Sequence, residues 1–340
     1  MNKKGSVVLE TFESKILKSN PLGDPVSRDF PVYLPHSYFS SGKRFPVVFL
    51  LSGFTGKGIM NMNVNFLSEN IQQRLDRLIS TKKMKEMIVV MPDCITRYGG
   101  SQFINSSGTG KYEDYVIKEL VPYIDAKYKT IQNRNSRAVC GKSSGGYGSV
   151  VLAMKNPDVF GLMCSTAGDM YFEYCYQPDF PKFITDIEHY GKGNKAVEHF
   201  IKNELNYKQP KPKYFFNILN IIGMASCYSP DPQGFTSKGY NFNLPFDIYS
   251  GELDSKVFNL WLKHDPVRMI DRYKNNLSKL NLIYLDAGVN DEYNLHSGAR
   301  IFCDKLKKNK INCIHEEFND GHMNIQYRYD RTFEIISEHI

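Results

Sequence analysis

The sequence has little of what marks a membrane-spanning, fibrous or disordered protein. Its longest apolar stretch, residues 45–51, is as long as a β-strand and far shorter than a membrane-spanning helix. There is no internal repeat and no tract of low complexity, and its 41% hydrophobic and 23% charged residues are near globular averages. These absences exclude a membrane span and indicate a folded globular protein.

The cysteine pattern does not suit a disulfide scaffold or a zinc site. The seven cysteines are an odd number, and no two of them form a C-x-x-C pair. Cys140 and Cys164 fall inside apolar runs that are typical of buried strands. We therefore expect the cysteines to be small buried side chains in a reducing compartment, and we expect no bound metal.

The N-terminus and the charge balance bear on location and partners. The apolar run near the N-terminus stops at Glu10, too early for a signal peptide, which predicts a cytoplasmic protein; a processed secreted form also fits. The net charge of +7 is mild for 340 residues and the basic residues are spread out, so no nucleic-acid partner is expected. The basic segment 208–213 is interpreted as a solvated Pro-rich loop. A homodimer is compatible with the sequence.

Strand-like and helix-like stretches alternate along most of the chain. Continuous apolar runs, such as residues 45–53 ending in glycine, are typical of strands buried on both faces of a parallel sheet. The pattern predicts one α/β domain over residues 1–340, with a mostly parallel central sheet and helices on both faces. Strands are expected at 6–17, 28–34, 45–53, 87–92, 137–140, 161–165, 282–286 and 313–318, and helices at 64–80, 111–128, 145–155, 266–280, 294–308 and 326–339.

Regular alternation fails between residues 169 and 264. This stretch is rich in aromatic residues and is interrupted by glycine and proline. We interpret it as an insertion between two strands of the sheet that forms a lid or a pocket wall, and not as a separate domain.

The segment Gly141-Lys-Ser-Ser-Gly145 matches the pattern G-x-S-x-G. A strand-like run precedes it and a helix of small residues follows, which is the context of a nucleophilic serine on a sharp turn. Glycines on either side permit the strained backbone, and the helix N-terminus offers N–H donors to an oxyanion. Only Ser143, and not Ser144, lies between the two required glycines. The alternative interpretation is a Gly/Ser-rich turn that packs a helix on a strand.

A serine nucleophile needs a base, and His322 is the best placed of the eight histidines. It lies in a turn just after the strand 313–318, where a loop at the carboxyl end of the sheet would deliver an imidazole. His315 lies within that strand, and the others lie in the insertion, in a helix or far from this end of the chain. The alternative for His322 is a solvated turn histidine.

The acid that orients this histidine should follow the strand 282–286. We favour Asp291, which comes after a glycine that lets the chain turn back over the sheet; Asp286 and Glu292 remain alternatives. Asp291 could instead cap the helix that begins near Asn294. As the acid it would hold one imidazole tautomer and stabilise the imidazolium.

The remaining parts of the site are expected in loops at the same edge of the sheet. We predict the backbone N–H groups of Ser144 and Phe54 as the oxyanion hole, because a glycine turn follows the strand 45–51. Substrate-binding side chains are expected in the loops 93–110 and 169–176, whose aromatic residues suit an apolar or aromatic group. The residues singled out there are Tyr98, Ser101, Gln102, Asp169 and Tyr171.

With these motifs in view, the chain from about Phe30 to the C-terminus resembles the putative-esterase family of α/β-hydrolases. That family includes feruloyl and acetylxylan esterases, S-formylglutathione hydrolases, enterochelin esterases and mycolyltransferases. The resemblance rests on residues 47–56, 91–93, 112–120, 141–146, 286–292 and 321–322. It implies the α/β-hydrolase fold and a serine esterase that cleaves carboxylic esters or thioesters of small molecules without a cofactor, with Ser143, Asp291 and His322 as the triad.

The motifs also depart from the family's usual ones. Ser52 stands where a histidine usually precedes the glycine, Lys142 where His, Leu or Phe is commoner before the nucleophile, and Ser144 where Met is frequent. These departures remove no catalytic part but leave the substrate open. Two alternatives to the esterase are an acyltransferase that uses the same triad and a catalytically silent hydrolase fold that serves as a binding module.

Overall fold

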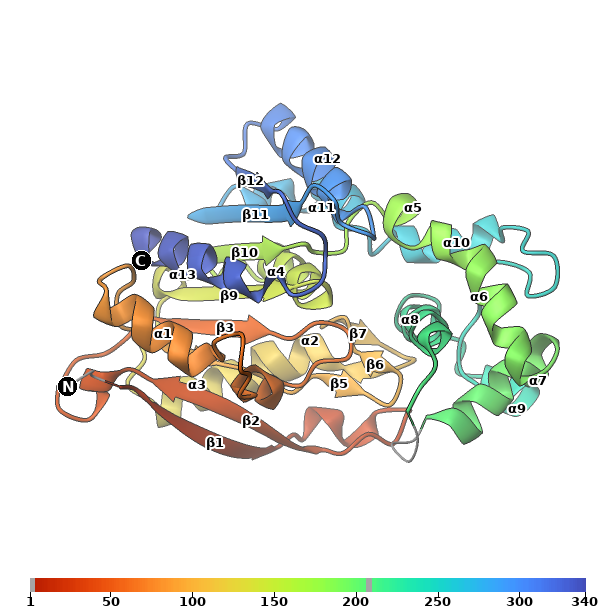
Figure 1. Cartoon of the computed structure of the whole chain (residues 1–340), viewed down its shortest axis with the longest axis horizontal. Coiled ribbons are helices and arrows are strands. Elements are labelled where there is room, and N and C mark those ends of the chain that lie inside the picture. The colour runs from red at the N-terminus through yellow and green to blue at the C-terminus, as the bar shows by residue number, and fades with distance from the viewer. Residues whose placement is uncertain (1–3, 206–209) are drawn as a thin grey trace.

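A computed structural model describes residues 4–205 and 210–340 of the chain. Lys208 and Gln209 of the basic segment, like the first three residues, lie outside the described residues. The chain is built around one eight-stranded sheet with helices on both of its faces (Figure 1). The predicted architecture of a layered α/β fold is therefore confirmed.

The sheet has the strand order β1-β2-β4-β3-β9-β10-β11-β12. Strand β1 pairs antiparallel with β2, and β2 pairs antiparallel with β4, whereas every other neighbouring pair is parallel. The strands are β1 (Ser6–Glu13), β2 (Ser27–Leu34), β3 (Val47–Leu51), β4 (Ile88–Val90), β9 (Arg137–Lys142), β10 (Leu162–Thr166), β11 (Leu282–Gly288) and β12 (Ile314–Phe318). All eight coincide with predicted strands; the first ends at Glu13 and not at residue 17.

Alternate residues of each central strand pack into two separate hydrophobic cores, one on each face of the sheet. In β3, Val48 and Leu50 pack on the face covered by α1 (Ile71–Ser80) and α13 (Tyr329–His339). Val47 and Phe49 pack on the opposite face. That face is covered by α3 (Val121–Lys127), α4 (Ser144–Lys155), α11 (Pro266–Leu277) and α12 (Leu295–Lys308). Because both faces are covered, these strands consist of continuous apolar runs.

Two predicted helices differ in detail. The helix expected over 64–80 begins only at Ile71, where Asn70 caps it by accepting a hydrogen bond from the N–H of Gln73. The helix expected over 111–128 is α2 (Tyr112–Asp114), a π-helical turn (Tyr115–Leu120) and α3 in direct succession. Between β4 and α2 lie two small hairpins, β5 (Ile95–Thr96) with β6 (Gly99–Gly100) and β7 (Asn105–Ser106) with β8 (Gly110–Lys111).

The segment between β10 and β11 is helical, although the sequence suggested irregular structure. Figure 1 shows its helices α6 to α9 beyond the carboxyl ends of β3 and β10. Its longest helix, α8, buries residues on nearly all sides, so its sequence lacks the one-sided apolar period that reveals a surface helix. The helices are α5 (Phe172–Cys175), α6 (Phe180–Ile187), α7 (Gly193–His199), α8 (Lys213–Tyr228), α9 (Gly234–Lys238) and α10 (Ser255–Leu262).

Two further observations concern the expectations from composition. All seven cysteines lie in the described ranges and are free thiols, and six of them are buried, with Cys313 the exception. Within residues 4–205 and 210–340, none of the helices is both long enough and apolar enough to pass through a bilayer.

Candidate active site

Ser143 lies on a sharp turn between the end of β9 and the start of α4. Its backbone has φ 58° and ψ −128°, a conformation that L-residues rarely adopt. A β-carbon on Gly145 would lie 2.2 Å from the carbonyl oxygen of Leu51, and one on Gly141 would lie 2.6 Å from the backbone of Gly145. Both glycines of the G-x-S-x-G pattern are thus required, because helix α4 begins in direct contact with the neighbouring strand.

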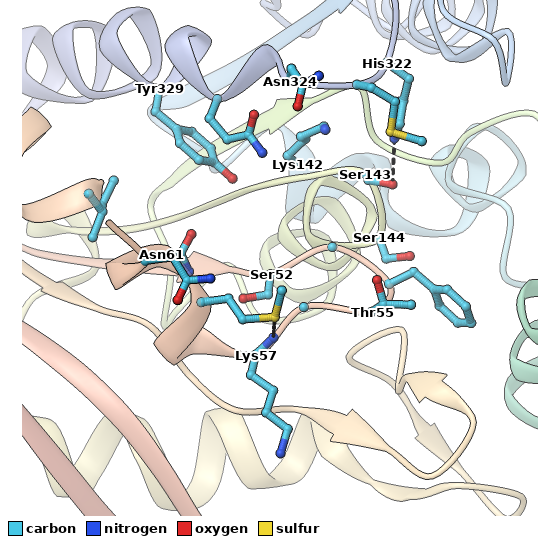
Figure 2. Close-up of a pocket in the computed structure, with 18 of the residues that line it drawn as sticks. Ser52, Thr55, Lys57, Asn61, Lys142, Ser143, Ser144, His322, Asn324 and Tyr329 are labelled. Atoms are coloured by element: carbon cyan, nitrogen blue, oxygen red, sulfur yellow. Dashed lines mark hydrogen bonds between the residues drawn. The ribbon is translucent and has the colours of Figure 1, made fainter. Parts of the chain in front are cut away.

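His322 reaches Ser143 from the loop that follows β12. Its Nε2 lies 3.0 Å from the Oγ of Ser143, and its Nδ1 lies 2.9 Å from the Oδ2 of Asp291. A carboxylate only accepts hydrogen bonds, so Nδ1 carries the proton and Nε2 is free to accept from the serine hydroxyl. The imidazole is nearly buried, and the ring of Tyr293 lies edge-on to it with centroids 4.9 Å apart. Figure 2 shows His322 directed at Ser143.

Asp291 accepts hydrogen bonds both from the His322 ring and from the backbone of its own loop. While Oδ2 accepts from His322, Oδ1 accepts from the backbone N–H groups of Tyr293 at 2.9 Å and Leu295 at 3.4 Å. Asp291 thus also bonds to Leu295, the first residue of α12, although the N-cap position of that helix is Asn294 and not Asp291. Because both carboxylate oxygens are engaged, the carboxylate is held in one orientation.

The two alternative acids have other partners. Glu292 Oε2 accepts a 2.6 Å hydrogen bond from the backbone N–H of His322, so it fixes the main chain and not the ring. Asp286 lies buried at the end of β11 and pairs with the guanidinium of Arg328 at 2.7 Å. Burial raises the pKa of Asp286, and Arg328 partly offsets this. Neither carboxylate contacts the imidazole.

The two residues whose backbone N–H groups are expected to hold an oxyanion line the cleft together with Ser143. Strand β3 pairs with β9 so that Leu51 lies opposite Gly141, which brings the loop after Leu51 next to the serine turn. Ser144 is the first residue of α4, where a backbone N–H has no partner within the helix. Both Phe54 and Ser144 line the same cleft as Ser143.

Ser143 opens onto a cleft of about 540 Å³. One wall comes from the helical segment after β10, with Asp169, Tyr176, Phe216 and Asn220. The rest carries many polar side chains among a few apolar ones and comes from the loop after β3, the start of α1 and the chain after His322. The residues on that side include Ser52, Asn61, Asn63, Asn65, Ser68, Glu69, Asn70, Arg74, Lys142, Asn324, Gln326 and Tyr329.

Of the five predicted substrate-binding residues, only Asp169 lies in the cleft. Tyr98 and Ser101 are buried behind it. Tyr171 lies at the start of α5, where the guanidinium of Arg268 stacks on its ring at 5.7 Å. The loop after β4 folds into its own hairpins and is covered by α8, which explains why it does not reach the cleft.

A buried polar network stands behind Ser144. Asp169 Oδ2 accepts hydrogen bonds from Tyr176 at 2.8 Å, Gln102 at 3.2 Å and the Oγ of Ser144 at 3.3 Å. Gln102 also donates to the hydroxyl of Tyr228 at 3.1 Å. Burial raises the pKa of Asp169, and these hydrogen bonds oppose the rise. Gln102 is thus part of the support of the site and does not line it.

Several cleft residues were missed by sequence reasoning. Asn324, Gln326 and Tyr329 follow His322 closely, so their position was accessible from the motif, but nothing in the sequence showed that the chain stays at the cleft there. Asn220 and Phe216 come from α8, whose existence was not predicted. Among the residues that the structure describes, no group of three or more His, Cys, Asp or Glu side chains could hold a metal ion.

The chain matches the model of a family described as "Putative esterase" over residues 25–322. A curated relative, the endo-1,4-beta-xylanase/feruloyl esterase of Xylanibacter ruminicola, is 31% identical over 176 residues, which are 49% of this chain and 24% of that protein. The chain covers about a quarter of the length of the curated relatives that are 30% identical or more.

Solved structures share the fold over the whole chain. A ferulic acid esterase superposes with a TM-score of 0.61 at 18% identity, and each chain is covered completely. An S-formylglutathione hydrolase from Agrobacterium tumefaciens has a TM-score of 0.59 at 16% identity, with 100% of this chain and 97% of that chain covered. The chain thus has the predicted α/β-hydrolase fold, and, since the family model matches most of its length, it belongs to the putative esterase family.

Proposed function

We propose that the protein is a serine esterase that hydrolyses carboxylic esters through an acyl-enzyme on Ser143. The observation that carries this proposal is the unbroken hydrogen-bond chain from Ser143 Oγ through the His322 ring to Asp291 at the base of an open cleft. Membership of the family supports it, because the curated relatives include proteins named as esterases.

In the first step of the proposed reaction, both ring nitrogens of His322 take part. Ser143 Oγ attacks the ester carbonyl while its proton passes to Nε2 of His322, only 3.0 Å away. Asp291, paired with Nδ1, stabilises the imidazolium that forms. The buried position of both groups strengthens this interaction, because little water screens it.

The tetrahedral intermediate carries a negative oxygen that needs donors. We assign this role to the N–H groups of Ser144 and Phe54, with the positive end of α4 adding to the potential at Ser144. His322 then returns its proton to the leaving alcohol oxygen as the ester bond breaks. In the second half, water is deprotonated by His322, attacks the acyl carbon and releases Ser143.

We also propose that the whole chain acts as one domain, in which the segment 169–264 forms one wall of the cleft. Tyr176, Phe216 and Asn220 from this segment line the cleft. This wall would determine which esters fit into the cleft. The hydrogen-bonded residues Ser143, His322 and Asp291 would carry out the cleavage.

The test is labelling with a fluorophosphonate probe, followed by rates on p-nitrophenyl esters of increasing chain length and on methyl ferulate. Wild type should be labelled and active, and Ser143→Ala should lose both. Labelling or turnover that persists in Ser143→Ala would refute the mechanism. A wild type that is inert to every ester would favour a binding module, and transfer to an added alcohol in excess of hydrolysis would favour an acyltransferase.

A further inference from the structure

The side chains of Ser52 and Lys142 lie at the ends of two neighbouring strands, on one face of the sheet, and line the cleft. Val48 and Leu50 of β3 and Ala138 and Cys140 of β9 pack on the side of α1 and α13. Side chains alternate along a strand, so the next residues on that face are Ser52 and Lys142. Because Leu51 lies opposite Gly141, Ser52 and Lys142 follow as neighbours at the strand ends, and both line the cleft beside Ser143.

The ammonium group of Lys142 has no partner in the part of the chain that the structure describes. Among the described residues, its Nζ forms no hydrogen bond and no ion pair within 4.0 Å, although the side chain is partly buried. The carboxylates that influence it most are Asp291 and Glu292, and both are engaged by His322. Burial lowers the pKa of Lys142, and these two carboxylates offset only part of that effect.

Neutral hydrogen-bond donors surround this lysine. The Oγ of Ser52 is buried and has no hydrogen-bond partner in the described part of the chain. Figure 2 shows Lys142 between Ser143, Asn324 and Tyr329. The Tyr329 hydroxyl and the side-chain amides of Asn324 and Gln326 line the cleft, and none of them is engaged by another described residue. A buried donor without a partner is costly, so the Ser52 hydroxyl suits an acceptor brought by a ligand. The amides of Asn324 and Gln326 are exposed to solvent and are free to bond to the same acceptor.

The other charges of the cleft are already neutralised or lie elsewhere. Arg74 pairs with Asp330, and Glu69 pairs with Arg77 at 2.7 Å. Asp169 lies on the far side of Ser143, in the network behind Ser144. Lys57 is exposed at the rim. Among the described residues that line the cleft, Lys142 is therefore the charged group that is close to the nucleophile and has no counterion.

We propose that Lys142, with Ser52, Asn324, Gln326 and Tyr329, forms a subsite for a carboxylate group, so that the preferred substrate is an ester that carries one negative charge close to the scissile bond. The inference rests on the proposed esterase function and names its substrate class. One cation among neutral donors balances a monoanion, which favours a carboxylate over a doubly charged phosphate. A carboxylate accepts several hydrogen bonds at once, so it can bond to more than one of these side-chain donors as well as to the ammonium group of Lys142.

The test compares esters that differ only in this charge. On the acyl side, monomethyl glutarate is compared with its neutral analogue, the methyl ester of glutaric acid monoamide. On the alcohol side, acetylglycolate is compared with acetylglycolamide. We expect wild type to prefer the charged member of at least one pair by about tenfold in kcat/KM, because a charge-assisted hydrogen bond in a shielded site contributes this much. The pair that shows the preference tells on which side of the scissile bond the subsite lies.

The preference should depend on Lys142 and not on the general positive charge of the protein. In Lys142→Met, which keeps an unbranched side chain one atom shorter and without the charge, the charged-to-neutral ratio of kcat/KM should fall to near one. In the matched control Lys111→Met, an exposed lysine outside the cleft, the ratio should stay at the wild-type value. A wild type without preference in either pair, or a Lys142→Met variant that retains the preference, would overturn the proposal.

A binding measurement separates this proposal from the esterase proposal. Monomethyl glutarate and acetylglycolate are titrated by NMR into Ser143→Ala and into Ser143→Ala/Lys142→Met, with the neutral analogues as controls. Tighter binding of a charged ester that is lost with Lys142 supports the subsite even if no ester is turned over. Equal binding of charged and neutral esters refutes the subsite even if the enzyme hydrolyses both.

Discussion

The Nε2 atom of His322 lies 3.0 Å from the Oγ of Ser143, although 179 residues separate the two along the chain. Ser143 follows β9 and His322 follows β12, and two further strands link them in the sheet order. All of the parallel strands point the same way, so loops that leave their carboxyl ends meet at one edge. The site therefore forms only when the two halves of the chain have joined into one sheet, and the helical segment 169–264 need not fold as a separate unit for this to happen.

The role of Asp291 can be tested with an isosteric change. Asp291→Asn keeps the shape of the side chain but offers an amide where His322 Nδ1 needs an acceptor, which favours the wrong imidazole tautomer. We expect kcat on p-nitrophenyl acetate to fall by about 10³ to 10⁴, with a much smaller change in KM.

Glu292 provides the control for this variant. It is adjacent in sequence and also bonds to His322, but through the backbone N–H. Glu292→Gln retains an oxygen acceptor there, so we expect a loss below about tenfold. If Glu292→Gln were as inactive as Asp291→Asn, the assignment of Asp291 as the orienting acid would fail.

Backbone strain at Ser143 should be visible as a difference in stability between two inactive variants. Ser143 has φ 58° and ψ −128°, which disfavours alanine as much as serine but not glycine. The strain that glycine removes is larger than the cost of its more flexible unfolded state. We therefore expect the free energy of unfolding in urea to be about 1 kcal/mol higher for Ser143→Gly than for Ser143→Ala. A Gly variant that is less stable than the Ala variant would show that the turn is not strained.

Much of the fold and three residues of the candidate site could be predicted from the sequence, because their signals are local. Each central strand is a continuous apolar run, and Gly141 and Gly145 mark a turn that permits the contact of α4 with Leu51. The order of the serine, the acid and the histidine along the chain, each placed after a strand, led to Ser143, Asp291 and His322.

The lining of the cleft could not be predicted in the same way. Which side chains face it depends on how loops fold over the sheet and on packing between distant segments. Tyr98 looked suitable from its place after a strand, but α8 covers that loop and buries it. The role of Lys142 could not be predicted either, since the absence of an ion-pair partner among the described residues is a property of its three-dimensional surroundings.

The close approach of α4 to β3 predicts a sharp sensitivity at one glycine. Gly145→Ala would bring a methyl group to 2.2 Å from the carbonyl oxygen of Leu51, and neither backbone can move without disturbing the serine turn. We expect a loss of at least about 2 kcal/mol in the free energy of unfolding, together with a loss of labelling at Ser143.

The matched control is Gly42→Ala, at an exposed glycine where an added β-carbon would contact nothing within 4 Å. It should change the free energy of unfolding by less than about 0.5 kcal/mol in either direction. Similar losses in the two variants would mean that the chain responds to the Gly-to-Ala change itself and not to contact with Leu51.

His264 should make the protein less stable in mild acid. It is the last residue of the segment 169–264, just before α11, and its ring stacks on Tyr228 with centroids 5.2 Å apart. Burial, helped by the charges of Lys155 and Lys263, lowers the pKa of this imidazole to about 4, whereas an unfolded histidine titrates near 6.5. Below pH 6.5 the unfolded chain therefore takes up a proton that the folded chain does not take up until about pH 4, and stability falls with pH through this window.

The variant His264→Phe keeps an aromatic ring against Tyr228 but cannot bind a proton. We expect the difference in unfolding free energy between wild type and variant to change by about 1–2 kcal/mol between pH 7.5 and pH 5, to the disadvantage of wild type. Urea unfolding at both pH values measures it. Buried carboxylates with raised pKa, such as Asp169 and Asp265, act in the opposite direction, but they are present in both proteins and cancel in the difference. If the two proteins lost stability in parallel, the imidazole of His264 would have to be accessible to protons in the folded state.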